Sequence, residues 1–244
     1  MEIDKLVQQL EREPVLPEGP EERFSGYGVL GVSFSTGDVL ALRHFPASSV
    51  GPGYSSVWHR DSIGIWEFFT DIEPHLSCTR YFGRAVADVS VTSIQINWTD
   101  ANAFEVKVDG PDLEWVVKLK NTTSTSLLNL LSNMLPQNAW KSEAVVSNME
   151  RVASNMLHAG SLTLAGKAPN GQHFIAKPNL VTLVDTSKAL LRGKDLGHVA
   201  KLPQQARIGQ FCIPTKGLFM LGQLYFEPFD PDNHDLVMHI HTSL

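Results

Sequence analysis

The sequence predicts a mainly β fold, an antiparallel barrel or sandwich with a two-helix insertion near the middle of the chain. Strand-like runs separated by turn signals recur about every ten residues over 26–121, which is typical of such folds. Apolar residues then change to helical spacing over 124–158, and strand-like runs return over 161–228.

This pattern divides the chain into five segments. They are an acidic leader (1–24), a first β unit (25–122), a helical insert (123–159), a second β unit completing the same barrel or sandwich (160–229), and a tail (230–244).

The first predicted element is a short amphipathic helix over residues 3–12. Ile3, Val7 and Leu10 recur at helical spacing, and Pro14 ends the pattern.

The first β unit opens with two strands around a turn at Ser35–Asp38, whose Gly37 suits a hairpin. Alternation or β-rich composition predicts further strands at 54–61, 64–71, 80–91, 93–100, 103–109 and 113–121.

The insert is predicted as two helices, 124–135 and 137–158, separated by Pro136. In the second β unit, Asn170-Gly171 is the strongest hairpin signal of the chain. The stretch 181–204 is mixed, and within it we expect loop or a short helix over 185–197, followed by strands over 205–228.

Composition excludes several classes of protein. The net charge of −6 disfavours nucleic-acid binding, and two cysteines exclude a disulfide scaffold. No apolar run is long enough to span a bilayer, and the acidic N-terminus lacks the features of a signal peptide, so we expect a cytoplasmic protein.

No sequence motif predicts a metal or a cofactor. Residues 26–31 read GYGVLG, which matches the dinucleotide-binding pattern, but a strand-like run follows where that pattern needs a helix. We therefore interpret these glycines as a strand start or bulge.

Residues 39–81 concentrate charged and aromatic side chains in strand-like runs. Alternation places His59 with Val57, Glu67 with Phe69, and Arg43 with other apolar neighbours. A buried histidine beside a carboxylate can act as a general acid–base pair, whereas a structural ion-pair network would show the same pattern.

Both interpretations stay open at this stage. In the functional one, His59 and Glu67 are the catalytic candidates. The substrate-binding candidates are Arg43, Trp58, Arg60, Trp66, Arg80 and Tyr81.

The helical insert also has two interpretations. It either forms a lid over a cavity or covers one face of the sheet as an ordinary helix pair. Its candidate ligand-facing residues are Leu127, Leu128, Leu131, Met134, Met149 and Met156.

Three segments (26–61, 161–176 and 213–228) resemble a group of uncharacterised bacterial proteins of this length. The β-rich layout also resembles lipocalin-type barrels and, more remotely, the double-lipocalin group of carotenoid 1,2-hydratases and natural-product cyclases. That architectural resemblance implies a terpenoid- or polyketide-like ligand inside a barrel, and it transfers no catalytic residue.

The leading hypothesis is therefore a barrel that binds a hydrophobic small molecule and isomerises, hydrates or cyclises it without a cofactor. A non-catalytic carrier using the same pocket is the first alternative. A protein-interaction module using the helical insert is the second, and a homodimer is compatible with any of them.

Overall fold

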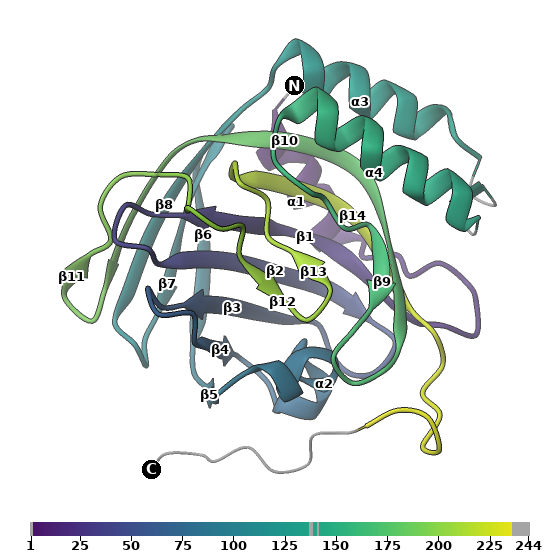
Figure 1. Ribbon diagram of the computed structural model, residues 1–244, viewed down its shortest axis with the longest axis horizontal. Coiled ribbons are helices and arrows are strands. Elements are labelled where there is room, and N and C mark those ends of the chain that lie inside the picture. Colours follow the sequence, from purple (N-terminus) through teal and green to yellow (C-terminus); the bar gives the residue numbers. More distant parts are fainter. Residues whose placement is uncertain (1, 137–138, 141, 236–244) are drawn as a thin grey trace.

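The computed structural model describes residues 2–136, 139–140 and 142–235, and one large curled sheet organises them (Figure 1). Its strands are β1 (Glu22–Ser33), β2 (Val39–Ser48), β3 (Tyr54–Arg60), β4 (Trp66–Thr70), β5 (Asp88–Val91), β6 (Ile94–Asp100), β7 (Ala103–Val108), β8 (Leu113–Lys120), β9 (Ala165–Lys167), β10 (His173–Leu191), β11 (Lys194–Asp195) and β14 (Leu218–Phe226). A separate small hairpin consists of β12 (Arg207–Ile208) and β13 (Phe211–Cys212).

The helices are few, and the predicted mainly β fold is confirmed. They are α1 (Ile3–Arg12), α2 (Thr79–Phe82), α3 (Thr123–Met134) and α4 (Glu143–Leu157), with short 3-10 turns η1 (Pro74–Leu76) and η2 (Gly83–Ala85). None of the described helices is long and apolar enough to cross a membrane.

The strand order explains the curl. It runs β5-β4-β3-β2-β1-β14-β10-β8-β7-β6, with every pair antiparallel except β4–β5. The two outermost strands, β5 and β6, are separated in the chain only by Thr92 and Ser93. Because two residues span only a few ångströms, the sheet must bend until its edges approach each other there, which gives a half-barrel.

The inner face of the curl holds the first hydrophobic core. Strands from both ends of the order contribute to it, including Val57, Phe69, Phe104 and Trp115. Helix α1 completes this core with its fully buried Ile3 and Val7, so the predicted helix of residues 3–12 is confirmed and packs into the interior.

The opposite face of β1–β4 carries the second core. The segment 71–87, which includes α2, and the segment 202–213, which includes β12 and β13, cover it. Trp58, Phe68 and Phe211 are among the aromatic rings that meet there, and the stacked pair Trp58–Phe68 has a centroid separation of 4.4 Å.

Helices α3 and α4 lie side by side against β10 (Figure 1). Thr122 and Thr125 form a capping box at the start of α3, which satisfies backbone N–H groups that a helix leaves free. Leu128 of α3 packs with Val181 of β10 and Leu218 of β14. The insert therefore covers one region of the sheet, with part of its apolar surface left exposed.

The prediction of one strand over residues 80–91 is wrong for most of that run. Residues 79–85 form α2 and η2, and only Asp88–Val91 is a strand. The reason is topological: β5 lies parallel to β4, and parallel neighbours need a crossover connection, which residues 71–87 supply.

The expectation of loop or helix within 181–204 is wrong up to Leu191. Strand β10 continues through this stretch and pairs with both β14 and β8. Its polar residues alternate with buried ones, and buried Ser187 accepts a hydrogen bond from Trp115 Nε1 at 2.7 Å. Hydrogen bonding to the neighbouring strands keeps this stretch of β10 extended, although its residues have low strand propensity.

Two predictions reach outside the described residues. The second helix of the insert was expected from residue 137, yet residues 137–138 and 141 are not described. The same holds for the tail beyond residue 235.

Candidate functional site

The candidate residues of 39–81 occupy two opposite faces of the β2–β3–β4 sheet. His59 pairs directly with Glu67 across β3–β4, and Leu40 lies opposite His59 on β2, so these residues face the first core. Trp58 and Arg43 alternate onto the second core. The sheet therefore separates the predicted acid–base pair from most predicted binding residues.

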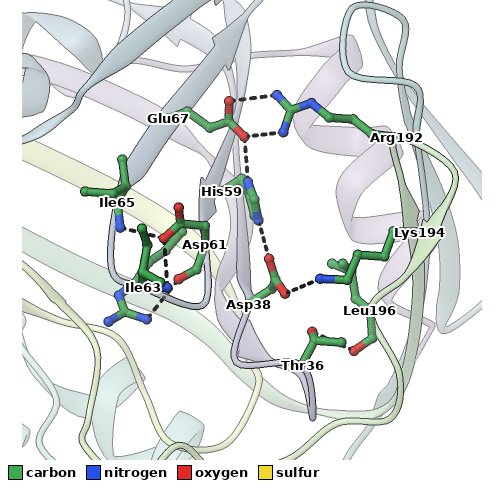
Figure 2. A network of polar contacts seen from close by, with 11 residues as sticks. Thr36, Asp38, His59, Asp61, Ile63, Ile65, Glu67, Arg192, Lys194 and Leu196 are labelled. Carbon is green, nitrogen blue, oxygen red and sulfur yellow. Dashed lines mark hydrogen bonds and ion pairs between the residues drawn. The ribbon is translucent and has the colours of Figure 1, made fainter.

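His59 lies between two carboxylates (Figure 2). Its Nδ1 is 2.6 Å from Glu67 Oε1, and its Nε2 is 2.8 Å from Asp38 Oδ1. The imidazole therefore bridges the two carboxylates through its two ring nitrogens. Arg192 extends the network, donating from Nη1 and Nη2 to the two Glu67 oxygens at 2.8 Å each.

Electrostatic interactions keep the two carboxylates of this network, Glu67 and Asp38, ionised. Burial raises the pKa of Glu67, but the hydrogen bonds from His59 and Arg192 outweigh it and bring the pKa to about 2. Burial also raises the pKa of Asp38, yet hydrogen bonding, including that from His59, leaves it below its usual value. Lys194 adds a positive charge 3.8 Å from Asp38.

The network ties three neighbouring strands to a distant turn. Asp38 directly precedes β2, and His59 and Glu67 lie on β3 and β4. Arg192 lies in the tight turn between β10 and β11, where its φ is +52°. His59 is only 4% exposed, and it lines none of the described cavities. The acid–base role of His59 and Glu67 accordingly stays a prediction.

The second face contains a cavity of about 50 Å³. It lies between strands β1, β2, β3, β10 and β14 and the covering residues of α2 and β13. Its aromatic lining comprises Phe45, Tyr54, Trp58, Tyr81, Phe82, Phe174, Phe211 and Phe226.

Glycines of β1 form part of the cavity wall. A Cβ at Gly28 would lie 2.1 Å from the Leu42 carbonyl oxygen, so only glycine permits this approach of β1 to β2. The register of this pair shifts on both sides of Gly28. The GYGVLG motif therefore lies inside a bulged strand, as predicted, and does not open a helix.

Arg43 is the charged group of this cavity. It is 7% exposed, and its Nη1 donates to the carbonyl oxygens of Val29 (2.7 Å) and Leu42 (2.8 Å). Its Cζ lies 4.5 Å from the ring centre of Trp58 and 5.6 Å from that of Phe211. Burial lowers the pKa of Arg43 to about 10, so it remains positively charged at neutral pH.

Two groups beside Arg43 were not among the sequence candidates. The Tyr54 hydroxyl and the Cys78 thiol lie 3.2 Å apart in the cavity wall, and burial raises the pKa of both, that of Cys78 to about 11. Alternation could have placed Tyr54 with Trp58, four residues further along β3. No local pattern predicts that Cys78 lies beside this cavity, because Cys78 belongs to the irregular crossover segment 71–87.

The other predicted binding residues have partners of their own. Arg80 Nη2 and the Tyr81 hydroxyl donate to the same carboxylate, Glu22, at 2.6 and 2.7 Å. Trp66 Nε1 donates to the Arg207 carbonyl oxygen at 3.0 Å, and Arg60 lies at the partly exposed end of β3. Tyr81 lines the cavity with its ring, whereas Trp66, Arg60 and Arg80 do not line it.

The chain is similar to several solved structures at low sequence identity. No family model and no curated protein matches the sequence. An acetoacetate decarboxylase from Legionella pneumophila is 10% identical over 89% of this chain and 88% of its own, with a TM-score of 0.39. A second acetoacetate decarboxylase structure is 12% identical over 93% and 92%, with a TM-score of 0.37.

A third solved structure, described as a putative AttH from Nitrosomonas europaea, is 12% identical over 87% of this chain and 53% of its own, with a TM-score of 0.31. The remoter resemblance to carotenoid hydratases and cyclases stays a prediction.

Proposed function

We propose that this protein binds a hydrophobic small molecule in the cavity beside Arg43. The observation that carries this proposal is the aromatic-lined space between the sheet and its cover. Aromatic side chains give large apolar contact areas at low entropic cost, and small-molecule sites combine such walls with a few polar groups. Arg43, Tyr54 and Cys78 supply those polar groups.

We further propose that the ligand is terpenoid- or polyketide-like. His59 and Glu67 would then act as an acid–base pair in its isomerisation, hydration or cyclisation. The 2.6 Å contact between the two side chains supports this reading.

A non-catalytic carrier is the alternative that one specific observation favours. Neither His59 nor Glu67 lines the cavity, so a bound molecule would meet aromatic walls and Arg43 and no acid–base pair. An interaction module has support from the exposed side chains of Leu130 (57% exposed) and Met134 (72%) on α3.

Binding of 1-butanol, a neutral alcohol small enough for this cavity, tests the proposal. Ala176 lines the cavity, and Ala176→Val would fill part of it, whereas exposed Ala144 on α4 gives the matched variant Ala144→Val. We expect calorimetry to show binding by the wild type and by Ala144→Val, and a loss of about tenfold or more in Ala176→Val. Absence of binding, or binding indifferent to Ala176→Val, would contradict the proposal.

A further inference from the structure

Arg43 is a buried cation without a counter-ion. In the part of the chain that the structure describes, no carboxylate lies within ion-pair distance of its guanidinium, whereas Arg80 and Arg192 each have one. Burying a charge without a partner is unfavourable, so such groups are normally paired. The arrangement is explained if an anion from outside the chain completes it.

The guanidinium is also positioned to receive such an anion. Nη1 uses its two hydrogens on backbone carbonyls, and within the described residues Nε and Nη2 have no acceptor. Trp58 and Phe211 lie within cation–π distance of the guanidinium, and all three groups line the same cavity. An arginine fixed in this way offers planar donors that match a carboxylate.

A second cavity of about 30 Å³ lies next to the first and indicates where the apolar part of a ligand would extend. It lies beneath α3 and α4, where Leu128, Met149 and Val181 are in its lining. It shares Leu30, Thr163, Leu164, Phe211 and Met220 with the first cavity, so these five residues form the boundary between the two. Met220 is an adaptable side chain at this boundary.

We propose that the ligand is a small carboxylic acid whose carboxylate pairs with Arg43 and whose apolar tail points past Met220 towards the helix pair. This inference rests on the proposed function and adds the chemical class of the ligand. The restricted volume and the single cation favour a monoanionic carboxylate over a phosphate, which carries more charge and oxygen atoms.

The test uses matched small acids and alcohols, propionate against 1-propanol and butyrate against 1-butanol, with binding measured by calorimetry at pH 7. We expect each acid to bind the wild type about 10- to 100-fold more tightly than its alcohol, the range expected for a hydrogen bond to a charged group. In Arg43→Met this preference should disappear. Arg151→Met, at an exposed arginine of α4, should retain it.

If Arg43→Met binds no ligand, melting temperatures show whether the variant is still folded. Because Met removes an unpaired buried charge, the ligand-free variant should melt at or above the wild-type temperature, and butyrate should raise the melting temperature of the wild type only. Met220→Trp, which retains Arg43, should weaken the binding of butyrate far more than that of acetate.

The outcomes separate the two proposals. Equal affinity for acid and alcohol in the wild type, or an acid preference that survives Arg43→Met, would overturn the carboxylate inference and leave the proposed function intact. Failure of acids and alcohols alike to bind would overturn both.

Discussion

His59 Nδ1 lies 2.6 Å from Glu67 Oε1, directly across the β3–β4 pair, while the second nitrogen of the ring contacts Asp38. Each partner of the histidine is thus a carboxylate, and Glu67 is bound in turn by Arg192. Removing any member leaves buried charges unbalanced. This arrangement yields two predictions about stability.

His59→Gln should lower the free energy of unfolding by about 3 kcal/mol, because Asp38 and Glu67 would then lose the imidazole that bridges them. Urea denaturation at pH 7 measures this loss. His75→Gln, at an exposed histidine of η1, should change it by less than about 0.5 kcal/mol. Similar values for the two variants would show that the network contributes little.

Glu67→Gln should make stability less sensitive to acid. The folded pKa of about 2 lies below the ordinary value of 4.5, so the carboxylate stabilises the fold above about pH 4.5 and loses this contribution as the pH falls towards 2. We expect a wild-type advantage of about 2 kcal/mol at pH 7, lower than the full shift because of solvent screening, that shrinks over this window. Denaturation at several pH values measures it, with exposed Glu73→Gln as control; an advantage independent of pH would contradict the assignment.

The catalytic prediction has its own test. If the protein converts a bound ligand and His59 and Glu67 act as acid and base, substituting either with alanine should slow turnover by about 10²- to 10⁴-fold. Turnover is compared at equal folded fractions, so that the loss of stability is not counted. Unchanged turnover in both variants would leave the network a structural role.

Gly28→Ala should disrupt the contact between β1 and β2. The added methyl group would lie 2.1 Å from the Leu42 carbonyl oxygen, a backbone atom that cannot move without displacing β2. We expect a destabilisation of about 2 kcal/mol or more, measured by thermal unfolding. Gly110→Ala is the control, because its new methyl group would meet only the movable Thr92 side chain, at 3.1 Å.

Leu128→Ala should show that α3 is bound firmly to the sheet. Leu128 is 4% exposed and packs with Val181, so its truncation should cost about 2–4 kcal/mol of unfolding free energy. Leu130→Ala, on the same helix at 57% exposure, should cost less than about 0.5 kcal/mol. Equal and small effects would indicate that the helix pair detaches easily.

Local patterns predicted much of the candidate site. Strand alternation placed His59 and Glu67 on one face and Trp58 on the other, because side chains of a strand point to alternate sides whatever the rest of the chain does. The same rule could not identify Asp38 and Arg192 as partners. Arg192 is brought to Glu67 by the pairing of β10 with β8 and β14, which no local spacing encodes.

By itself, the sequence determined the elements whose signals are local: the stripe of α1, the turn at Ser35–Asp38, the strands of the first β unit and the start of α3. Only the tertiary structure decided that segment 71–87 is a helical crossover, that β10 runs through a polar stretch, and that Arg43 meets Tyr54, Cys78 and Phe211 around one cavity. The physical reason is that periodicity fixes which face of a strand is buried, whereas the partner of that face is chosen by contacts between residues far apart in the chain.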